Sequence, residues 1–254
     1  MTIPLSILVL TRNEETKLAE CLDSVQGLGE IVVVDSLSSD ATLDIARRYT
    51  DQIYPRPFEG FGSQRNYGLD RCRGEWVMML DADERFTPEL RAEVNQIVSQ
   101  PQLCAGFWVS RRNIVFGKWL RHGGVYPDYT LRFWQRARGR YVEQIIHELP
   151  QINGIIGRLK CDLIHLSYPD ISSILTKQDR YSKLLAQQLR AEGRRWHRWD
   201  ITLKPLYVLF HMIVIRMAWR DGWQGVTYAI LSSYSMFLKH AMYRELMAQQ
   251  EAKR

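Results

Sequence analysis

The apolar run Trp76-Val77-Met78-Met79-Leu80 ends abruptly at Asp81-Ala82-Asp83-Glu84, and this pattern constrains the fold more than any other part of the chain. A continuous apolar run of this length predicts a strand buried on both faces, as in a parallel sheet covered by helices. The aspartates then lie at the strand end, where open α/β sheets bind ligands. Their carboxylates suit Mg²⁺ or Mn²⁺, and such a cation suits a diphosphate. Alone, the motif could equally be a charged turn that ends a strand.

Two earlier apolar runs predict strands of the same kind. Residues 5–10 are followed by the polar loop Thr11-Arg12-Asn13-Glu14, and residues 31–34 are followed by Asp35-Ser36. Apolar residues recur at helical spacing over residues 15–26 and again after the second run. Strands that alternate with helices predict an α/β fold with a mostly parallel sheet, in which the strand ends meet at one edge. We therefore expect these polar ends to line one crevice of nucleotide size.

The turn after the first strand contains no glycine-rich phosphate-binding sequence. Neither G-x-G-x-x-G nor G-x-x-x-x-G-K-[ST] occurs there. These patterns are typical of dinucleotide-binding and P-loop proteins, so both classes are disfavoured. Other side chains must then hold the phosphates. Arg65 is one candidate, because Gln64-Arg65-Asn66 falls in a predicted helix and a guanidinium can pair with diphosphate oxygens. A surface arginine that covers apolar groups with its stem would give the same pattern.

Charge is distributed unevenly along the 254 residues. The formal net charge is +6, but residues 1–150 carry −2 and residues 151–254 carry +8. This asymmetry indicates an anionic partner, either membrane headgroups, nucleic acid or an acidic substrate. The four cysteines are scattered without metal-ligand spacing, which predicts reduced, packed thiols. The apolar run at the N-terminus is short and follows no basic segment, so we read it as a strand and expect a cytoplasmic protein.

Four segments in the first hundred residues resemble the nucleotide-sugar-binding motifs of family 2 glycosyltransferases, and they occur in the family's order. They are Leu8–Glu15, Val32–Thr42, Gln64–Gly68 and Leu80–Glu84. Further segments resemble the bacterial branch that builds lipopolysaccharide cores and other surface glycans. These are Arg132-Phe133, Val142–Glu148, His165–Tyr168, Lys177 with Arg180–Ser182, and Arg220–Gly225. The resemblance implies a GT-A fold, which is Rossmann-like, over residues 1–168, with a C-terminal helical extension over residues 169–254.

The resemblance also implies roles for individual residues. In this family the first loop and the aspartate after the second strand embrace the nucleoside, and the second aspartate of the D-x-D motif holds the metal. Asp83 is thus the expected metal ligand, joined by His165, which could instead be a hydrogen-bonded structural residue. The expected nucleotide-sugar-binding residues are Thr11, Arg12, Asn13, Glu14, Asp35, Ser36, Arg65 and Asp81. Asp35 and the loop residues could also serve only as turn or capping residues.

Transfer of a sugar with inversion requires a base that takes the proton of the acceptor hydroxyl. By resemblance, Glu148 in His147-Glu148 is the candidate base. Asp128 in Tyr126-Pro127-Asp128-Tyr129 is the second candidate, and both Asp128 and His147 are expected on the acceptor side. The simplest alternative for His147-Glu148 is a solvated strand end before Pro150. A bound Mg²⁺ or Mn²⁺ would stabilise the departing diphosphate.

The C-terminal region is helical by its apolar spacing and rich in arginine and tryptophan. Arg190, Arg194, Arg195 and Arg198 surround Trp196 and Trp199, a mixture typical of an interfacial membrane anchor as well as of a solvated face. Residues 206–219 are almost wholly apolar but too short to cross a bilayer, so they should lie on a membrane or pack. We expect residues 190–219 to meet the anionic inner face of the plasma membrane, as part of a peripheral protein.

The leading hypothesis is an inverting, metal-dependent glycosyltransferase that moves a sugar from a nucleotide-sugar, expected to be a UDP-sugar, to a glycan or lipid-linked acceptor of the bacterial envelope. A nucleotidyltransferase on a similar sheet would also use D-x-D metal sites, although it would usually carry a glycine-rich phosphate loop. A non-enzymatic membrane- or RNA-binding protein would explain the basic half. It would leave the acidic strand ends unexplained, and no RNA-binding signature is visible, so we expect no nucleic-acid partner.

Overall fold

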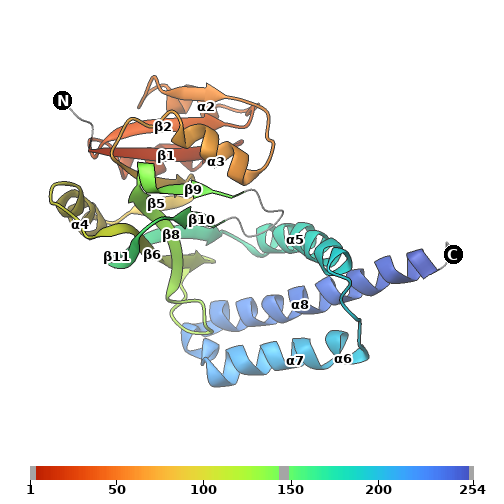
Figure 1. Cartoon of the computed structure of the whole chain (residues 1–254). Coiled ribbons are helices and arrows are strands. Elements are labelled where there is room, and N and C mark those ends of the chain that lie inside the picture. The colour runs from red at the N-terminus through yellow and green to blue at the C-terminus, as the bar shows by residue number, and fades with distance from the viewer. Residues whose placement is uncertain (1–3, 143–148, 252–254) are drawn as a thin grey trace. The chain divides into compact units, whose positions relative to one another are not determined.

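The computed structural model describes residues 4–142 and 149–251 (Figure 1). By contacts between residues, the chain divides into two units, one of Met1–Arg111 with Asp128–His165 and the other of Arg112–Pro127 with Leu166–Arg254. The expected division into a nucleotide-sugar-binding domain over residues 1–168 and a helical extension over residues 169–254 stays a prediction. The four cysteines are free, and Cys21 and Cys72 are buried, as expected for packed thiols.

The first unit is built on a mixed sheet with the strand order β3-β2-β1-β4-β8-β6-β11-β5. Its first four strands are parallel and β8 is antiparallel to β4. Their bounds are β1 Leu5–Thr11, β2 Glu30–Asp35, β3 Ile53–Pro55, β4 Trp76–Asp81, β5 Glu84–Phe86, β6 Cys104–Val115, β8 Asp128–Gln135 and β11 Ile155–Tyr168. A separate pair joins β9 (Gly139–Tyr141) to β10 (Pro150–Ile152). The α/β class expected from the sequence is confirmed.

Helices cover both faces of the parallel strands, which explains why those strands read as continuous apolar runs. Alternate residues of β1, β2 and β4 enter one core with helices α1, α2 and α4, and the intervening residues enter a second core with α3. The helix bounds are α1 Leu18–Asp23, α2 Thr42–Ala46, α3 Phe61–Leu69 and α4 Pro88–Val98. Both cores combine aliphatic and aromatic side chains, and each fully buried large apolar side chain contributes about 1.5–3 kcal/mol.

Several element predictions need correction. The helix expected over residues 15–26 is shorter, because residues 15–17 form a turn in which the amides of Lys17 and Leu18 donate to the Glu14 carbonyl. The strand that ends at Asp81 is the fourth and not the third, since the short edge strand β3 precedes it. Thr87 caps the N-terminus of α4: its hydroxyl accepts from the Leu90 amide, and Pro88 follows.

The second unit consists mainly of helices. Their bounds are α5 Ile171–Ala191, α6 Arg198–Ile201, α7 Leu203–Phe210, the π-helical turn His211–Ile215, the 3₁₀ turn Ala218–Asp221 and α8 Gly222–Glu251. Helix α8 lies between α5 and α7 and packs against both (Figure 1). A short hairpin strand, β7 (Lys118–Trp119), pairs with the end of β6 in the same unit.

The apolar segment expected over residues 206–219 is interrupted. Helix α7 ends at Phe210, and Met217 adopts a left-handed conformation with φ of 54°. In the described part of the chain, no single helix has both the length and the apolarity needed to cross a bilayer. Two consecutive segments, Arg198–Ile215 and Ala218–Gln249, meet those measures only together, and they are bent by 68° at the break.

Candidate active site

The polar ends of β2, β1 and β4 lie side by side, as the sequence predicted. In the parallel register Thr11 pairs with Asp35, and Leu10 pairs with Asp81. Neighbouring strands are about 5 Å apart, so the three strand ends fall within the span of one nucleotide. The fold therefore gathers three segments that are distant in sequence at one edge of the sheet.

Asp35 lies at the centre of a buried hydrogen-bond network. The Thr11 hydroxyl donates to Asp35 Oδ1 over 2.8 Å, and both the amide and the hydroxyl of Ser38 donate to the same carboxylate at 2.7 and 2.6 Å. The side chain of Asp35 has no exposed surface. Because Asp35 is fully buried, direct contact between a nucleoside and this carboxylate would require the residues around it to move.

The loops after β1 and β2 are fastened to each other by further hydrogen bonds. The Asn13 amide donates to the Ser38 hydroxyl at 2.8 Å, and the Ser39 amide donates to Asn13 Oδ1 at 2.9 Å. Asn13 and Leu37 both adopt left-handed backbone conformations, with φ of 55° and 56°. For residues other than glycine such conformations are costly, and they concentrate at binding sites. The two loops are therefore held together by hydrogen bonds that involve the side chains of Asn13 and Ser38.

Two other expected nucleotide-sugar-binding residues lie on the first of these loops, and their side chains differ in exposure. The side chain of Arg12 is exposed and that of Glu14 is half-buried. Partial burial raises the pKa of Glu14 despite the opposing charge of Lys17, and the carboxylates of Asp83 and Asp81 raise it further. Glu14 thus belongs to the same electrostatic environment as the D-x-D motif. The Ser36 hydroxyl accepts from Gln64 Nε2 at 2.9 Å, which joins the second loop to α3.

The D-x-D motif is part of a buried ion-pair network. Arg132, on β8, donates to the Asp81 carboxylate and lies 3.3 Å from Glu84 Oε1. The Asp81 amide donates to Glu84 Oε2 at 3.0 Å. The side chain of Glu84 is completely buried and that of Arg132 is 9% exposed. The Asp81 side chain, at the edge of the network, is 34% exposed. Because a buried charge must be paired, Glu84 and Arg132 depend on each other.

The network separates the proton affinities of its members. Burial alone raises the pKa of Asp81, but the positive charges of Arg132 and Arg65 outweigh this effect and hold the pKa well below its ordinary value. For Glu84, burial raises the pKa and exceeds the lowering effect of Arg132. Asp81 therefore remains an anion at neutral pH.

Asp128 belongs to the same network through Arg111. The Arg111 guanidinium lies 2.7 Å from Asp128 Oδ2 and 3.5 Å from Glu84 Oε1. Arg111 is on β6 and Asp128 is paired with it across the antiparallel ladder to β8. The second candidate base is thus already engaged with a cation.

Asp83 and His165, the two expected metal ligands, are brought together by β11 and β5. These strands are antiparallel, and His165 pairs with Glu84, the neighbour of Asp83. His165 Nε2 lies 3.5 Å from Asp83 Oδ2, and both side chains are largely buried. His165 lies within β11, which continues to Tyr168. Within the described ranges, no cluster of three or more Asp, Glu, His or Cys side chains is arranged to hold a metal.

Arg65 lies on α3, as the sequence predicted, and faces the same region electrostatically. Its guanidinium carbon is 5.1 Å from the ring centre of Tyr141 and 5.4 Å from that of Phe61. Among the positive charges that lower the pKa of Asp81, that of Arg65 has the second largest effect, after that of Arg132. Arg65 therefore adds a second cation beside Arg132 near the D-x-D motif.

The next residue, Asn66, holds the strand that leads to the candidate base. Its Nδ2 donates to the Tyr141 carbonyl at 2.8 Å, and its Oδ1 accepts from the Tyr141 amide at 3.0 Å. Tyr141 ends β9. His147 and Glu148 follow but lie outside the described residues, so their positions stay predictions.

Replacing Asn66 by alanine should therefore lower the free energy of unfolding by about 1–3 kcal/mol, because both polar groups of Tyr141 lose their partner. Urea unfolding of the purified protein would measure the change. Asn95→Ala is a matched control, since Asn95 is exposed on α4 and its replacement should change stability by less than about 0.5 kcal/mol. Equal stability of the two variants would contradict the anchoring role.

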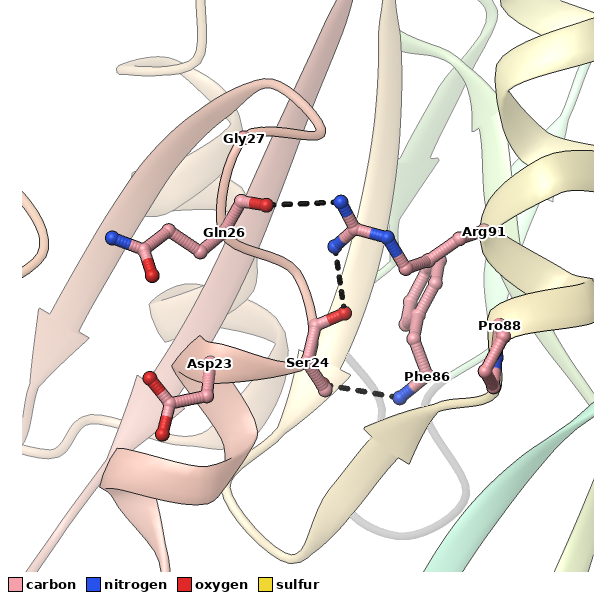
Figure 2. A pocket seen from close by; sticks show the side chains of 7 residues that line it. All are labelled: Asp23, Ser24, Gln26, Gly27, Phe86, Pro88 and Arg91. Atoms are coloured by element: carbon pink, nitrogen blue, oxygen red, sulfur yellow. Dashed lines mark hydrogen bonds between the residues drawn. The ribbon is translucent and has the colours of Figure 1, made fainter.

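A surface pocket lies at the C-terminal end of α1, next to the start of α4. Arg91 Nη1 and Nη2 donate to the carbonyls of Ser24 and Gln26 at 3.0 Å, and the Ser24 hydroxyl accepts from the Phe86 amide (Figure 2). The lining residues are Asp23, Ser24, Gln26, Gly27, Phe86, Pro88 and Arg91. None of the expected site residues is among them. The arginine ties the end of α1 to α4, which is a structural role.

Three residues of the site, Glu84, Arg111 and Arg132, were given no role from the sequence, although Glu84 and Arg132 lie in segments that resemble the family. Arg132 carried a usable signal, because it interrupts the apolar strand Leu131-Arg132-Phe133-Trp134 and a charge at such a position needs a buried partner. Glu84 directly follows the D-x-D motif, but its position in the sequence does not indicate that it is buried. Arg111 follows no comparable pattern.

Comparison with known proteins identifies the family. Residues 6–159 match glycosyl transferase family 2. A lipopolysaccharide core biosynthesis glycosyltransferase, LpsC of Rhizobium meliloti, is 28% identical over 94% of both chains. An uncharacterized glycosyltransferase of Rickettsia conorii is 24% identical, covering 96% of this chain and 91% of its own. Among solved structures, a mannosyltransferase from Pyrobaculum calidifontis is 17% identical with a TM-score of 0.49, covering 99% of this chain and 80% of its own.

The family match decides among the classes that the sequence left open. It covers the strand ends and the D-x-D motif, which a non-enzymatic membrane- or RNA-binding protein would leave unexplained, and it disfavours a nucleotidyltransferase. The sheet with helices on both faces agrees with the expected GT-A class. The chain therefore belongs to glycosyl transferase family 2 and is a glycosyltransferase.

Proposed function

We propose that the protein is an inverting, metal-dependent glycosyltransferase that uses a UDP-sugar and extends a glycan or lipid-linked acceptor in the synthesis of bacterial lipopolysaccharide or another envelope glycan. The similarity to LpsC over nearly the whole of both chains supports the pathway. The observation that carries the chemistry is the pairing of Asp83 with His165. Two residues before Asp83 lies Asp81, on which the positive charges of Arg132 and Arg65 act.

The Asp83–His165 pair fits a divalent cation. Two ligands that share a cation at about 2.1 Å each lie roughly 3 Å apart when adjacent, close to the 3.5 Å between these atoms. Mg²⁺ and Mn²⁺ commonly take one or two protein ligands and complete their shells with substrate phosphates and water. A nitrogen ligand favours Mn²⁺ over Mg²⁺. When bound, the cation would stabilise negative charge on the departing diphosphate.

The protein's own cations would act on the same diphosphate. Arg65 lies on α3, and its charge already acts on Asp81. Its planar guanidinium can bind phosphate oxygens in pairs. Arg132 is held by Asp81 and Glu84, so its role is to keep the D-x-D loop in place. The loops around Asp35 would form the wall against the nucleoside.

Glu148 is the proposed base. One structural argument supports Glu148, and it concerns the alternative base, Asp128. A proton taken up by Asp128 would disrupt its ion pair with Arg111, at a cost in free energy. A carboxylate outside this pair is the better acceptor of a proton from the acceptor hydroxyl. His147 would then lie on the acceptor side as a neighbour of the base.

Isothermal titration with UDP tests the donor and the metal together. We expect UDP to bind in the presence of Mn²⁺ and at least about tenfold more weakly in EDTA, because the cation bridges the protein and the diphosphate. GDP in the same buffer provides the comparison for the base. Equal affinity for UDP with and without the cation would refute the metal dependence, and tighter binding of GDP would refute the choice of donor.

A further inference from the structure

Helix α7 presents an apolar stripe to the outside. The stripe consists of residues spaced by three or four positions, which share one face of a helix. Four of its members are 54–65% exposed on α7 and the fifth, on the next turn, is 51% exposed. The residues of this outer stripe are Leu203, Leu206, Tyr207, Phe210 and Val214. A helix that packs on a protein core normally buries such a stripe, so the orientation is the reverse of the usual one.

The opposite side of α7 is already occupied. Pro205 is buried, and its carbonyl accepts from the Ser233 hydroxyl of α8 at 2.8 Å. Helix α7 lies along α8 (Figure 1). The outer stripe is therefore left over after α7 has packed within its own unit. Apolar exposure continues into the turn that follows, where Ile215, Met217 and Trp219 are 43–58% exposed.

The surface around the outer stripe is cationic. From residue 201 to residue 244 the chain contains one carboxylate, Asp221. Asp221 is buried, and it accepts from the amides of Arg121 and His122 and lies 2.8 Å from His122 Nδ1. It is thus used within the unit. Arg216 and Arg220, beside the apolar turn, are exposed.

More cations stand at the other end of α7. Arg194, Arg195 and Arg198 are exposed just before it, and Trp199 is 56% exposed among them. An apolar stripe bounded at both ends by arginine and tryptophan matches the composition of helices that lie in the headgroup region of a bilayer. Anionic headgroups would complement this charge.

A second copy of the chain is a less suitable partner for the outer stripe than a lipid surface. In a two-fold contact the same surface faces itself, so the arginines that border the outer stripe would be brought toward each other. No exposed carboxylate lies between residues 201 and 244 to compensate them. The charge pattern therefore favours an anionic lipid surface.

We propose that the outer stripe of α7 inserts into the headgroup region of an anionic phospholipid bilayer, with Arg216 and Arg220 among the lipid phosphates. The helix lies along the surface and does not cross it. The proposal deepens the proposed function, on which it rests only for the idea that the acceptor is lipid-linked. It names the membrane-binding residues and places Leu206 and Phe210 among them.

Co-sedimentation of the full chain with vesicles tests the proposal. The vesicles contain phosphatidylcholine alone or with about one third phosphatidylglycerol, at low salt. We expect the double variant Leu206→Gln, Phe210→Gln to bind anionic vesicles at least about tenfold more weakly than the wild type, because two inserted side chains are lost. The double variant Arg216→Gln, Arg220→Gln should lose roughly 30-fold on anionic vesicles and little on neutral ones.

The matched control replaces two apolar residues of the other unit that are more exposed than the stripe residues, Leu103→Gln with Ile155→Gln, and should bind vesicles like the wild type. If the double variant Leu206→Gln, Phe210→Gln (the stripe variant) binds anionic vesicles as tightly as the wild type, the proposal is wrong. A wild-type dimer, seen by analytical ultracentrifugation, that only the stripe variant loses would also overturn it. UDP titration of the same samples separates the two proposals, since the stripe variant should keep nucleotide binding whichever way its vesicle binding turns out.

Discussion

Replacing Asp83 by asparagine is expected to lower turnover on the order of a thousandfold. The substitution keeps the size of the side chain but removes the charge that would hold the cation beside His165. Metal ions contribute several kcal/mol to the stabilisation of a transition state, and each 1.36 kcal/mol is a factor of ten in rate. Release of UDP from a panel of UDP-sugars, with Mn²⁺ present, would measure the effect.

Comparison with Glu148→Gln makes this result specific. Loss of a general base costs about 10²–10⁴ in rate but leaves the donor site intact. We therefore expect Asp83→Asn to lose both turnover and the Mn²⁺-dependent part of UDP binding, and Glu148→Gln to lose turnover alone. Asp44→Asn is a control on the exposed end of a surface ion pair. Full activity in Asp83→Asn would remove the metal from the mechanism, and full activity in Glu148→Gln would return Asp128 to consideration.

Replacing Arg132 by methionine is expected to destabilise the protein by about 3–5 kcal/mol at neutral pH. The variant leaves Asp81 and the completely buried Glu84 without their shared cation, and loss of one partner of a buried ion pair has a cost of this size. Chemical unfolding monitored by circular dichroism gives the free energy. Arg140→Met is the matched control, because Arg140 forms an exposed pair with Asp70 at 2.7 Å and its loss should cost less than about 1 kcal/mol.

The pH dependence of this difference tests its cause. In the wild type the pKa of Asp81 lies below its ordinary value, so the ion pair stabilises the fold above the unfolded-state pKa and loses its effect as the pH falls through the folded-state value. In Arg132→Met, protonation of Asp81 and Glu84 relieves the unpaired charges. The stability gap between wild type and variant should therefore shrink as the pH falls from neutral toward about 4. A gap that does not change with pH would indicate lost packing instead.

The strand ends were predictable because the information lay in local patterns. Fully buried parallel strands read as uninterrupted apolar runs, and each run ended at polar residues. Consecutive βα units usually give neighbouring strands, which explains the pairs β1-β2 and β2-β3, whereas β4 lies on the other side of β1, where the strand order reverses. Thr11, Asp35 and Asp81 were accordingly placed on one edge from sequence alone, and the register of the strands confirms their adjacency.

The partners of these residues could not be predicted in the same way. Arg132 meets Asp81 because β8 is antiparallel to β4, and Arg111 meets Asp128 across β6 and β8. Such antiparallel pairings depend on long-range register, which no local period specifies. The resemblance to a family suggested His165 as a ligand of the metal, but only the ladder between β11 and β5 explains its approach to Asp83.

The C-terminal helices show a different limit. The periodicity of residues 203–214 indicates which side chains share a face but not whether that face turns inward. The break at Met217 was also hidden, since neither proline nor glycine marks it and its left-handed backbone is unusual for methionine. The expectation that this segment either lies on a membrane or packs was open for this reason, and the exposure of the outer stripe favours the first choice.

The ladder between β11 and β5 also has a consequence for the chain during its synthesis on the ribosome. A ribosome releases Asp83 early and His165 only after β6 and β8 have been made, so a nascent chain presents half of the pair for much of its synthesis. If the two residues share a cation as proposed, an unfinished chain cannot hold it well enough to split an activated sugar. Wasteful cleavage of the donor is then avoided until synthesis has passed His165.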